Sequence, residues 1–226
     1  MPYRVTPFIN EGYYHVFNRG VNKLNIFVNE RDFNQAMLSI DYYRFEKPPV
    51  KLSRFKSLPV TDQSRMITVM LNNNKTLIDI LCFVLMPNHW HFLLKQNIDN
   101  GISKFIANFS NSYARYFSTS HQWEGHLFQG QFKAVEIESE AQLIHVSRYI
   151  HLNPLVSGIT SNESLKYYKW SSFSDYLKNN SQKVQTEDIM RYFKTPLDYE
   201  KFIISYADYA RELEFIKHLT IDIKPD

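Results

Sequence analysis

Two histidines one residue apart are the residues of this sequence best suited to chemistry. His89 and His91 open an apolar stretch that runs to Leu94. Successive side chains of a β-strand point to opposite faces, so the two imidazoles would lie on one face. Neutral imidazoles are common metal ligands, and two of them form a metal site that lacks a third ligand. The alternative is a pair of ordinary strand histidines, because a catalytic metal usually takes three ligands from the protein.

A second pair of residues supplies what such a site would lack. Tyr149 and Asn153 are four apart, so they share a helix face if the last turn stays helical. The amide oxygen of Asn153 is a hard ligand that suits Mg²⁺ or Mn²⁺. The phenol of Tyr149 could attack a phosphate that a nearby cation polarises. Alternatively, Asn153 ends the helix before Pro154, and Tyr149 is a core aromatic.

The elements that must position these residues alternate between strands and helices. Apolar residues recur every three or four positions in the expected helices, and alternate or run continuously in the expected strands. The expected order is a strand at 12–20, a helix at about 29–45, strands at 78–86 and 89–95, a helix at 102–117 and a strand at 132–138. Pro87 and Asn88 predict a tight turn between the two middle strands. This order matches a ferredoxin-like βαββαβ α+β fold, an antiparallel sheet with helices on one face.

A further helix carries the tyrosine. Ser139 and Gln142 form a capping-box pattern, which predicts a helix start there. We expect this helix to end near Leu152, because Pro154 disfavours the helical conformation at Asn153.

The length of 226 residues suits one domain with appendages. We expect a catalytic domain at 1–177, with a basic insertion at about 47–77, and a helical C-terminal extension at 178–226. The single Cys82 excludes an intrachain disulfide and fits a cytoplasmic protein. The sequence contains neither a membrane-length apolar run nor a signal-peptide pattern, which predicts a protein without a membrane partner.

Charge is distributed unevenly along the chain. Residues 1–185 carry 20 Lys and Arg against 14 Asp and Glu, whereas residues 186–226 carry 6 against 9. A basic body with 15% aromatic residues suits a nucleic-acid partner, although most Phe and Tyr are expected in the core. The side chains expected to contact DNA phosphates are Arg19, Lys51, Arg54, Lys56, Lys133 and Arg148.

Five segments together resemble a known family. They occur in the family's order at residues 14–20, 83–94, 125–130, 148–154 and 170–173. The chain resembles the single-tyrosine HUH transposases (His-hydrophobic-His), especially the REP-associated tyrosine transposases, over about residues 10–176. The resemblance implies a ferredoxin-like domain that cleaves and rejoins single-stranded DNA, with hairpin-containing DNA as partner. It also implies that His89, His91 and Asn153 bind Mg²⁺ or Mn²⁺ and that Tyr149 is the nucleophile.

Two positions depart from the family pattern. Gln131 stands where members often have Arg, and Ser118 stands where they often have Asn. The loss of that Arg could weaken DNA binding, but neither change touches the four proposed catalytic positions.

Tyr113 competes with Tyr149 as nucleophile, because other branches of the superfamily carry the tyrosine on a differently placed helix. Tyr113 lies on an apolar stripe, and its partner four residues on is Phe117, which cannot bind metal. Ligand chemistry therefore favours Tyr149.

Three functions remain open from the sequence. The first is metal-dependent cleavage and strand transfer of single-stranded DNA through a 5′-phosphotyrosine. The second is a non-catalytic hairpin or single-strand binder that descends from a transposase. The third is an unrelated metal hydrolase, which lacks an obvious carboxylate base beside the histidines. Whether the protein acts as a monomer or a homodimer is also open.

Overall fold

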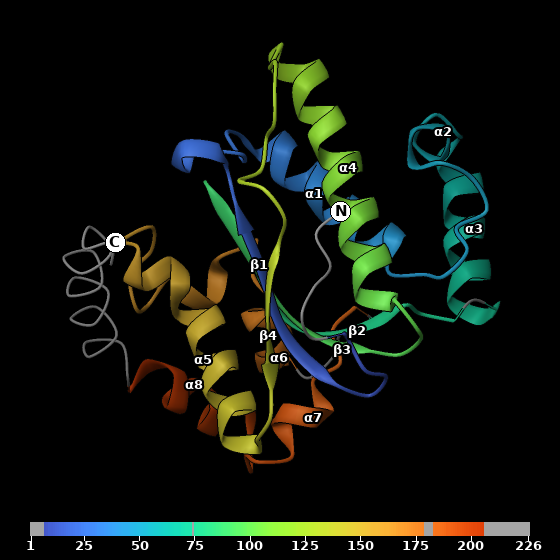
Figure 1. The fold of residues 1–226 in the computed structure, drawn as a ribbon. Helices are drawn as coiled ribbons and strands as arrows, with labels where there is room; N and C mark the ends of the chain where they lie inside the picture. Colours follow the sequence, from blue (N-terminus) through green and yellow to red (C-terminus); the bar gives the residue numbers. More distant parts are fainter. Residues whose placement is uncertain (1–6, 74, 179–182, 206–226) are drawn as a thin grey trace.

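A four-stranded antiparallel sheet separates two groups of helices (Figure 1). The computed structural model describes residues 7–73, 75–178 and 183–205. The strands are β1 (Tyr13–Arg19), β2 (Ile78–Met86), β3 (His89–Gln96) and β4 (Lys133–Ile137). They lie in the order β2-β3-β1-β4, and every neighbouring pair is antiparallel. This order confirms the predicted ferredoxin-like α+β fold.

One face of the sheet packs against α1 (Glu30–Tyr43) and α4 (Gly101–His121). Trp90 and Phe92 alternate with the two histidines along β3, and both are fully buried. Their rings meet Phe109 of α4 at centroid distances of 5.6 and 5.7 Å. The alternation predicted for this strand therefore places aromatic residues in the core and the histidines on the opposite face.

The opposite face is also covered, which corrects the expectation of helices on one face only. Helix α5 (Glu140–Val156) packs against β2 and β3, with α6 (Phe173–Lys178), α7 (Glu187–Met190) and α8 (Pro196–Ile204) beside it (Figure 1). The reason lies in β2, where every residue except Asp79 is buried. A strand that is apolar on both faces must be covered on both.

Helix α5 also continues beyond its expected end at Leu152, as far as Val156, with Pro154 inside it. Pro154 disfavours the helical conformation at the residue before it and removes one backbone donor, at a cost of about 3 kcal/mol in a helix interior. All residues from 150 to 155 are buried, so packing outweighs this preference. The Pro154 carbonyl also accepts from Ile159 N at 2.9 Å, which secures the turn that follows.

The predicted basic insertion forms a small helical unit. Helices α2 (Leu52–Lys56) and α3 (Val60–Asn73) pack on the end of α1. Their apolar residues join those at the end of α1 in a second buried cluster, which consists of Tyr42, Phe45, Leu52, Phe55 and Met70. Short 3-10 helices η1 (Val21–Lys23) and η2 (Leu165–Tyr167) complete the described elements.

The C-terminal helices share the main core. Ile189 of α7 and Tyr199 and Ile203 of α8 are buried in the same cluster as the sheet. Of the predicted extension at 178–226, the described part therefore packs as one body with the sheet, while residues 179–182 and 206–226 lie outside the described residues. None of the helices in the described ranges combines the length and apolar character of a membrane span.

Candidate active site

The first histidine is positioned by the β2–β3 hairpin. Met86 pairs with His89, so Pro87 and Asn88 form the tight turn that the sequence predicts. The Pro87 carbonyl accepts from Ile26 N at 2.7 Å and from Phe27 N at 2.9 Å, and the Asn88 carbonyl accepts from Gly20 N at 2.8 Å. These bonds hold the turn, and His89 follows it directly.

His89 faces Asn153 across the gap between sheet and helix. Its Nδ1 lies 2.6 Å from Oδ1 of Asn88, which can only accept, so Nδ1 carries the proton. Its Nε2 lies 3.3 Å from Oδ1 of Asn153. The amide nitrogen of Asn153 donates to the Tyr149 carbonyl at 3.1 Å, which turns the amide oxygen toward the histidine. In the tautomer of His89 that donates from Nδ1, a lone pair on Nε2 faces a lone pair of the Asn153 oxygen.

Two facing acceptors repel unless a proton or a cation lies between them. Adjacent ligands of an octahedral Mg²⁺, each about 2.1 Å from the ion, lie about 3 Å apart. The 3.3 Å separation of His89 Nε2 and Asn153 Oδ1 is close to that spacing. No group of three or more His, Cys, Asp or Glu side chains in the described ranges is arranged to hold a metal. The set of His89, His91 and Asn153 is not a group of that kind, because its third side chain is an amide rather than His, Cys, Asp or Glu.

The second histidine is oriented by a third one. His91 is buried, and its Nδ1 lies 2.9 Å from Nε2 of His15 on β1. When His91 Nδ1 donates this hydrogen bond, its other ring nitrogen keeps the lone pair that a metal ligand needs. Burial lowers the pKa of His15 to about 4. Burial, reinforced by the nearby His15 and His89, also holds the pKa of His91 well below its ordinary value. His15 and His91 are therefore neutral near pH 7.

Tyr149 lies beside these rings and reaches solvent. Its ring centroid is 5.4 Å from that of His91 and 5.8 Å from that of His15, both edge-on. The side chain is 40% exposed, so a phosphodiester could approach it from outside. Helix α5 thus brings Tyr149 and Asn153 to the two histidines of β3, although some 60 residues separate the pairs along the chain.

The competing tyrosine lies elsewhere. Tyr113 is fully buried on α4, on the opposite face of the sheet, and donates its hydroxyl hydrogen bond to the Ile26 carbonyl. Burial is the main reason why its pKa is raised far above the ordinary value, which disfavours the phenolate. Its setting is that of a core residue.

The structure adds His15 and Phe17, to which the sequence alone assigned no role. In the strand register Phe17 pairs with His91 and Arg19 pairs with His89, so β1 presents His15, Phe17 and Arg19 to the site. The signal was the alternation of His15, Phe17 and Arg19 within the first family motif. It became informative only once β1 was known to lie beside β3.

The residues expected to contact DNA do not form one surface. Arg19 and Lys133 are exposed. They lie on the site face, the face of the sheet that carries the two histidines of β3, where Lys133 pairs with Phe17. Lys51, Arg54 and Lys56 lie at or on α2, which stands on the side of α1 and α4, away from α5 (Figure 1).

Arg148 also lies off the exposed surface. It is buried, and its guanidinium carbon lies 3.4 Å from the centroid of the Phe202 ring. It packs α5 against α8, so we omit it from the proposed DNA-contacting residues.

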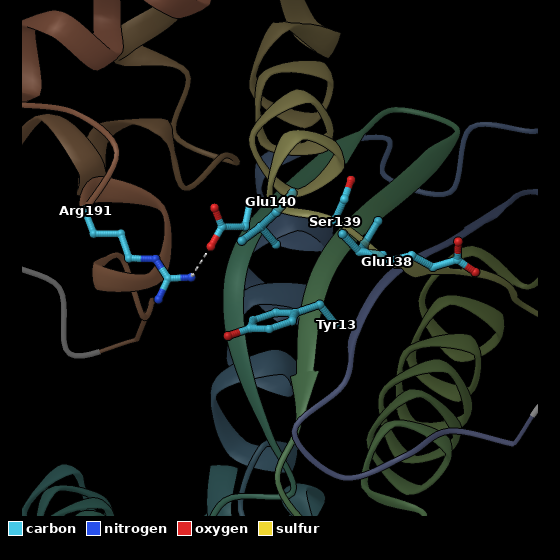
Figure 2. A pocket seen from close by; sticks show the side chains of 7 residues that line it. Tyr13, Glu138, Ser139, Glu140 and Arg191 are labelled. Carbon is cyan, nitrogen blue, oxygen red and sulfur yellow. Dashed lines mark ion pairs between the residues drawn. The ribbon is translucent and has the colours of Figure 1, made fainter.

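A cavity of about 270 Å³ opens at the other end of α5 (Figure 2). Glu138, Glu140 and Arg191 line it, and Arg191 pairs with Glu140 at 3.9 Å. Ten residues separate Ser139 at the start of α5 from Tyr149, about 15 Å along a helix. Two carboxylates against one guanidinium do not suit a phosphate, so this cavity is separate from the candidate site.

Residues 53–153 match a family model described as "Transposase IS200 like". This segment contains His89, His91, Tyr149 and Asn153. Over this segment the chain is similar to the IS200-like transposases. The resemblance predicted from the motifs is thereby confirmed, whereas no curated protein sequence matches the chain.

Solved structures resemble the chain only at low identity and with TM-scores below 0.5. A REP-associated tyrosine transposase bound to a REP hairpin matches with 13% identity and a TM-score of 0.49, over 79% of this chain and 86% of that one. A protein from Deinococcus radiodurans described as a transposase gives 14% and 0.36, over 66% and 95%. The tRNA(His) guanylyltransferase of Saccharomyces cerevisiae gives 10% and 0.37, over 91% and 80%. Likeness at this level carries no argument about activity.

Proposed function

We propose that the protein is a single-tyrosine HUH DNA transposase or endonuclease, which cleaves and transfers single-stranded DNA through a 5′-phosphotyrosine. The observation that carries the proposal is the convergence of α5 on β3. His89 Nε2 lies 3.3 Å from Asn153 Oδ1, and the Tyr149 ring stands edge-on to His91. Metal-ligand chemistry and an exposed nucleophile thus meet at one place. All four residues lie within the segment that matches the IS200-like family model.

Three of the residues would bind the metal ion, and Tyr149 would attack the phosphate. His89, His91 and Asn153 would hold Mg²⁺ or Mn²⁺, which when bound polarises a nonbridging oxygen of the scissile phosphate. The Tyr149 oxygen attacks phosphorus in line and loses its proton to solvent. The bond from phosphorus to the 3′ oxygen breaks, and that oxygen leaves as a 3′-hydroxyl after gaining a proton. Attack by another 3′-hydroxyl reverses these changes and rejoins the strand, so no ATP is consumed.

The surroundings of Tyr149 suit a single strand. Phe17 and Val135 lie on the same sheet face as the histidines, and Val135 is 55% exposed. An aromatic side chain such as Phe17 can stack with a base and Val135 can contact it, while Arg19 and Lys133 can pair with phosphates. The family resemblance further implies hairpin-containing DNA as the partner.

Covalent trapping tests the proposal. The protein is incubated with labelled single-stranded DNA from its own genomic neighbourhood and Mn²⁺, with an EDTA-treated sample as control. We expect a labelled protein band that survives denaturant and maps to Tyr149 by peptide sequencing. DNA binding without any adduct would instead indicate a non-catalytic binder, and an adduct on another residue would refute the assignment.

A further inference from the structure

A buried chain of hydrogen bonds runs along the far side of the tyrosine helix. His151 lies two positions from both Tyr149 and Asn153, so it projects from the opposite side of α5. The residue is fully buried. Its Nδ1 lies 2.8 Å from the Tyr199 hydroxyl, and its Nε2 lies 2.8 Å from the Ser172 hydroxyl. Both ring nitrogens are thus bound by protein groups, and neither faces the candidate site.

When Nδ1 of His151 carries the proton and Ser172 donates to Nε2, the donors and acceptors of this series of hydrogen bonds follow one direction. Ser147 donates to the Ile144 carbonyl at 2.8 Å and accepts from the Tyr199 hydroxyl at 3.2 Å. The Tyr199 oxygen is then free to accept from Nδ1–H of His151. At the other end, the backbone N–H of Phe83 donates to Ser172 at 2.9 Å. Every side chain in the series therefore has a partner on each side.

This series of hydrogen bonds connects α5 to three separate parts of the fold. Phe83 belongs to β2, Ser172 precedes α6, and Tyr199 belongs to α8. Ser147 and His151 are one helical turn apart on α5, so the helix is bound at two heights along one side. Two such attachments determine both the rotation of α5 about its axis and its position along that axis.

Rotation of α5 matters for the reaction on its other side. A side-chain tip about 6 Å from a helix axis moves by about 1 Å when the helix turns by about 10°. A misplacement of about 1 Å can cost about 100-fold in rate. Apolar contacts alone tolerate such sliding, whereas a buried hydrogen bond is costly to break.

We propose that Ser172, His151, Tyr199 and Ser147 are positioning residues, which set the rotation of α5 and hold Tyr149 and Asn153 against the two histidines of β3. This inference rests on the proposed function. It assigns α8 a role in the reaction, although Ser172 and Tyr199 lie outside the segment matched by the transposase family.

Two tyrosine variants separate positioning from general stability. Tyr199→Phe removes the oxygen that joins His151 to Ser147. Tyr176→Phe is the matched control, because Tyr176 is equally buried, stacks on Tyr199 at 4.7 Å and donates to the Leu81 carbonyl at 2.8 Å on β2. We expect Tyr199→Phe to slow adduct formation about 10- to 100-fold at saturating DNA and Mn²⁺, with an unchanged Kd for the strand. Tyr176→Phe should keep the wild-type rate.

A second readout does not need activity. In wild-type protein, NMR cross-relaxation should connect ring protons of Tyr149 and His91, whose centroids are 5.4 Å apart. Tyr199→Phe should weaken this signal and Tyr176→Phe should retain it. If Tyr199→Phe does not fold, Ser147→Ala serves instead, because it removes the hydroxyl that accepts the hydrogen bond from Tyr199.

The outcomes distinguish the two proposals. A wild-type protein that forms no adduct refutes the proposed function and leaves the NMR comparison to decide the positioning role. Equal rates and equal ring contacts in Tyr199→Phe and wild type would overturn the positioning role, as would equal losses in both tyrosine variants.

Discussion

Replacing Tyr149 by Phe should abolish activity with little loss of stability, whereas replacing Tyr113 by Phe should lower stability and keep activity. Tyr149→Phe removes one oxygen from a ring that is 40% exposed, so the free energy of unfolding should change by no more than about 1 kcal/mol. Tyr113→Phe removes the buried hydroxyl that donates to the Ile26 carbonyl and leaves that carbonyl without this donor. The expected cost is about 1–3 kcal/mol. For a chain of this size, that lowers Tm by about 2–12 °C.

The assay combines thermal unfolding with covalent trapping of labelled single-stranded DNA. Tyr149→Phe should form no adduct, while its Tm and its affinity for DNA stay near the wild-type values. Tyr113→Phe should form the adduct at a temperature well below its reduced Tm. The reasoning fails if Tyr149→Phe still cleaves, or if Tyr113→Phe loses the adduct while it remains folded.

Three further expectations follow from the site. His89→Ala should abolish cleavage and weaken Mn²⁺ binding while circular dichroism stays unchanged, and wild-type Mn²⁺ affinity in this variant would contradict the ligand assignment. Burial lowers the pKa of His15 to about 4 and that of His151 to about 3, from an ordinary 6.5, so the unfolded chain binds more protons below pH 6.5. The free energy of unfolding should therefore fall between pH 6.5 and 4, and equal urea midpoints at pH 7 and 4.5 would contradict this. Lys133→Gln should reduce the slope of log K for a single strand against log salt by about 0.7, whereas Lys51→Gln on the far side of the sheet should not. Equal slopes for these two variants would count against the proposed path of the strand.

Much of the geometry of the candidate site could be predicted because it depends on neighbours in sequence. A two-residue alternation places His89 and His91 on one face of any strand, and a four-residue spacing places Tyr149 and Asn153 on one face of any helix. Each rule holds wherever the element lies, so each pair could be expected before the elements were assembled.

The prediction for the end of α5 failed for a physical reason. The preference against helix before Pro154 is local and weak, and the burial of residues 150–155 outweighs it. How much of a helix end is buried depends on which elements pack on it, here β2 and α8. A local rule contains no such information.

The amino-acid sequence by itself therefore determined the two candidate pairs, the βαββαβ order and the family resemblance. Only the tertiary structure decided that β1 lies beside β3, which brings His15 to His91, and that α8 lies beside α5, which brings Tyr199 to His151. It also placed Arg19 and Lys133 on the site face, and Lys51 and Arg54 away from it. These relations join residues tens of positions apart. A continuous apolar run such as that of β2 indicates burial on both faces, but it does not say which elements cover each face.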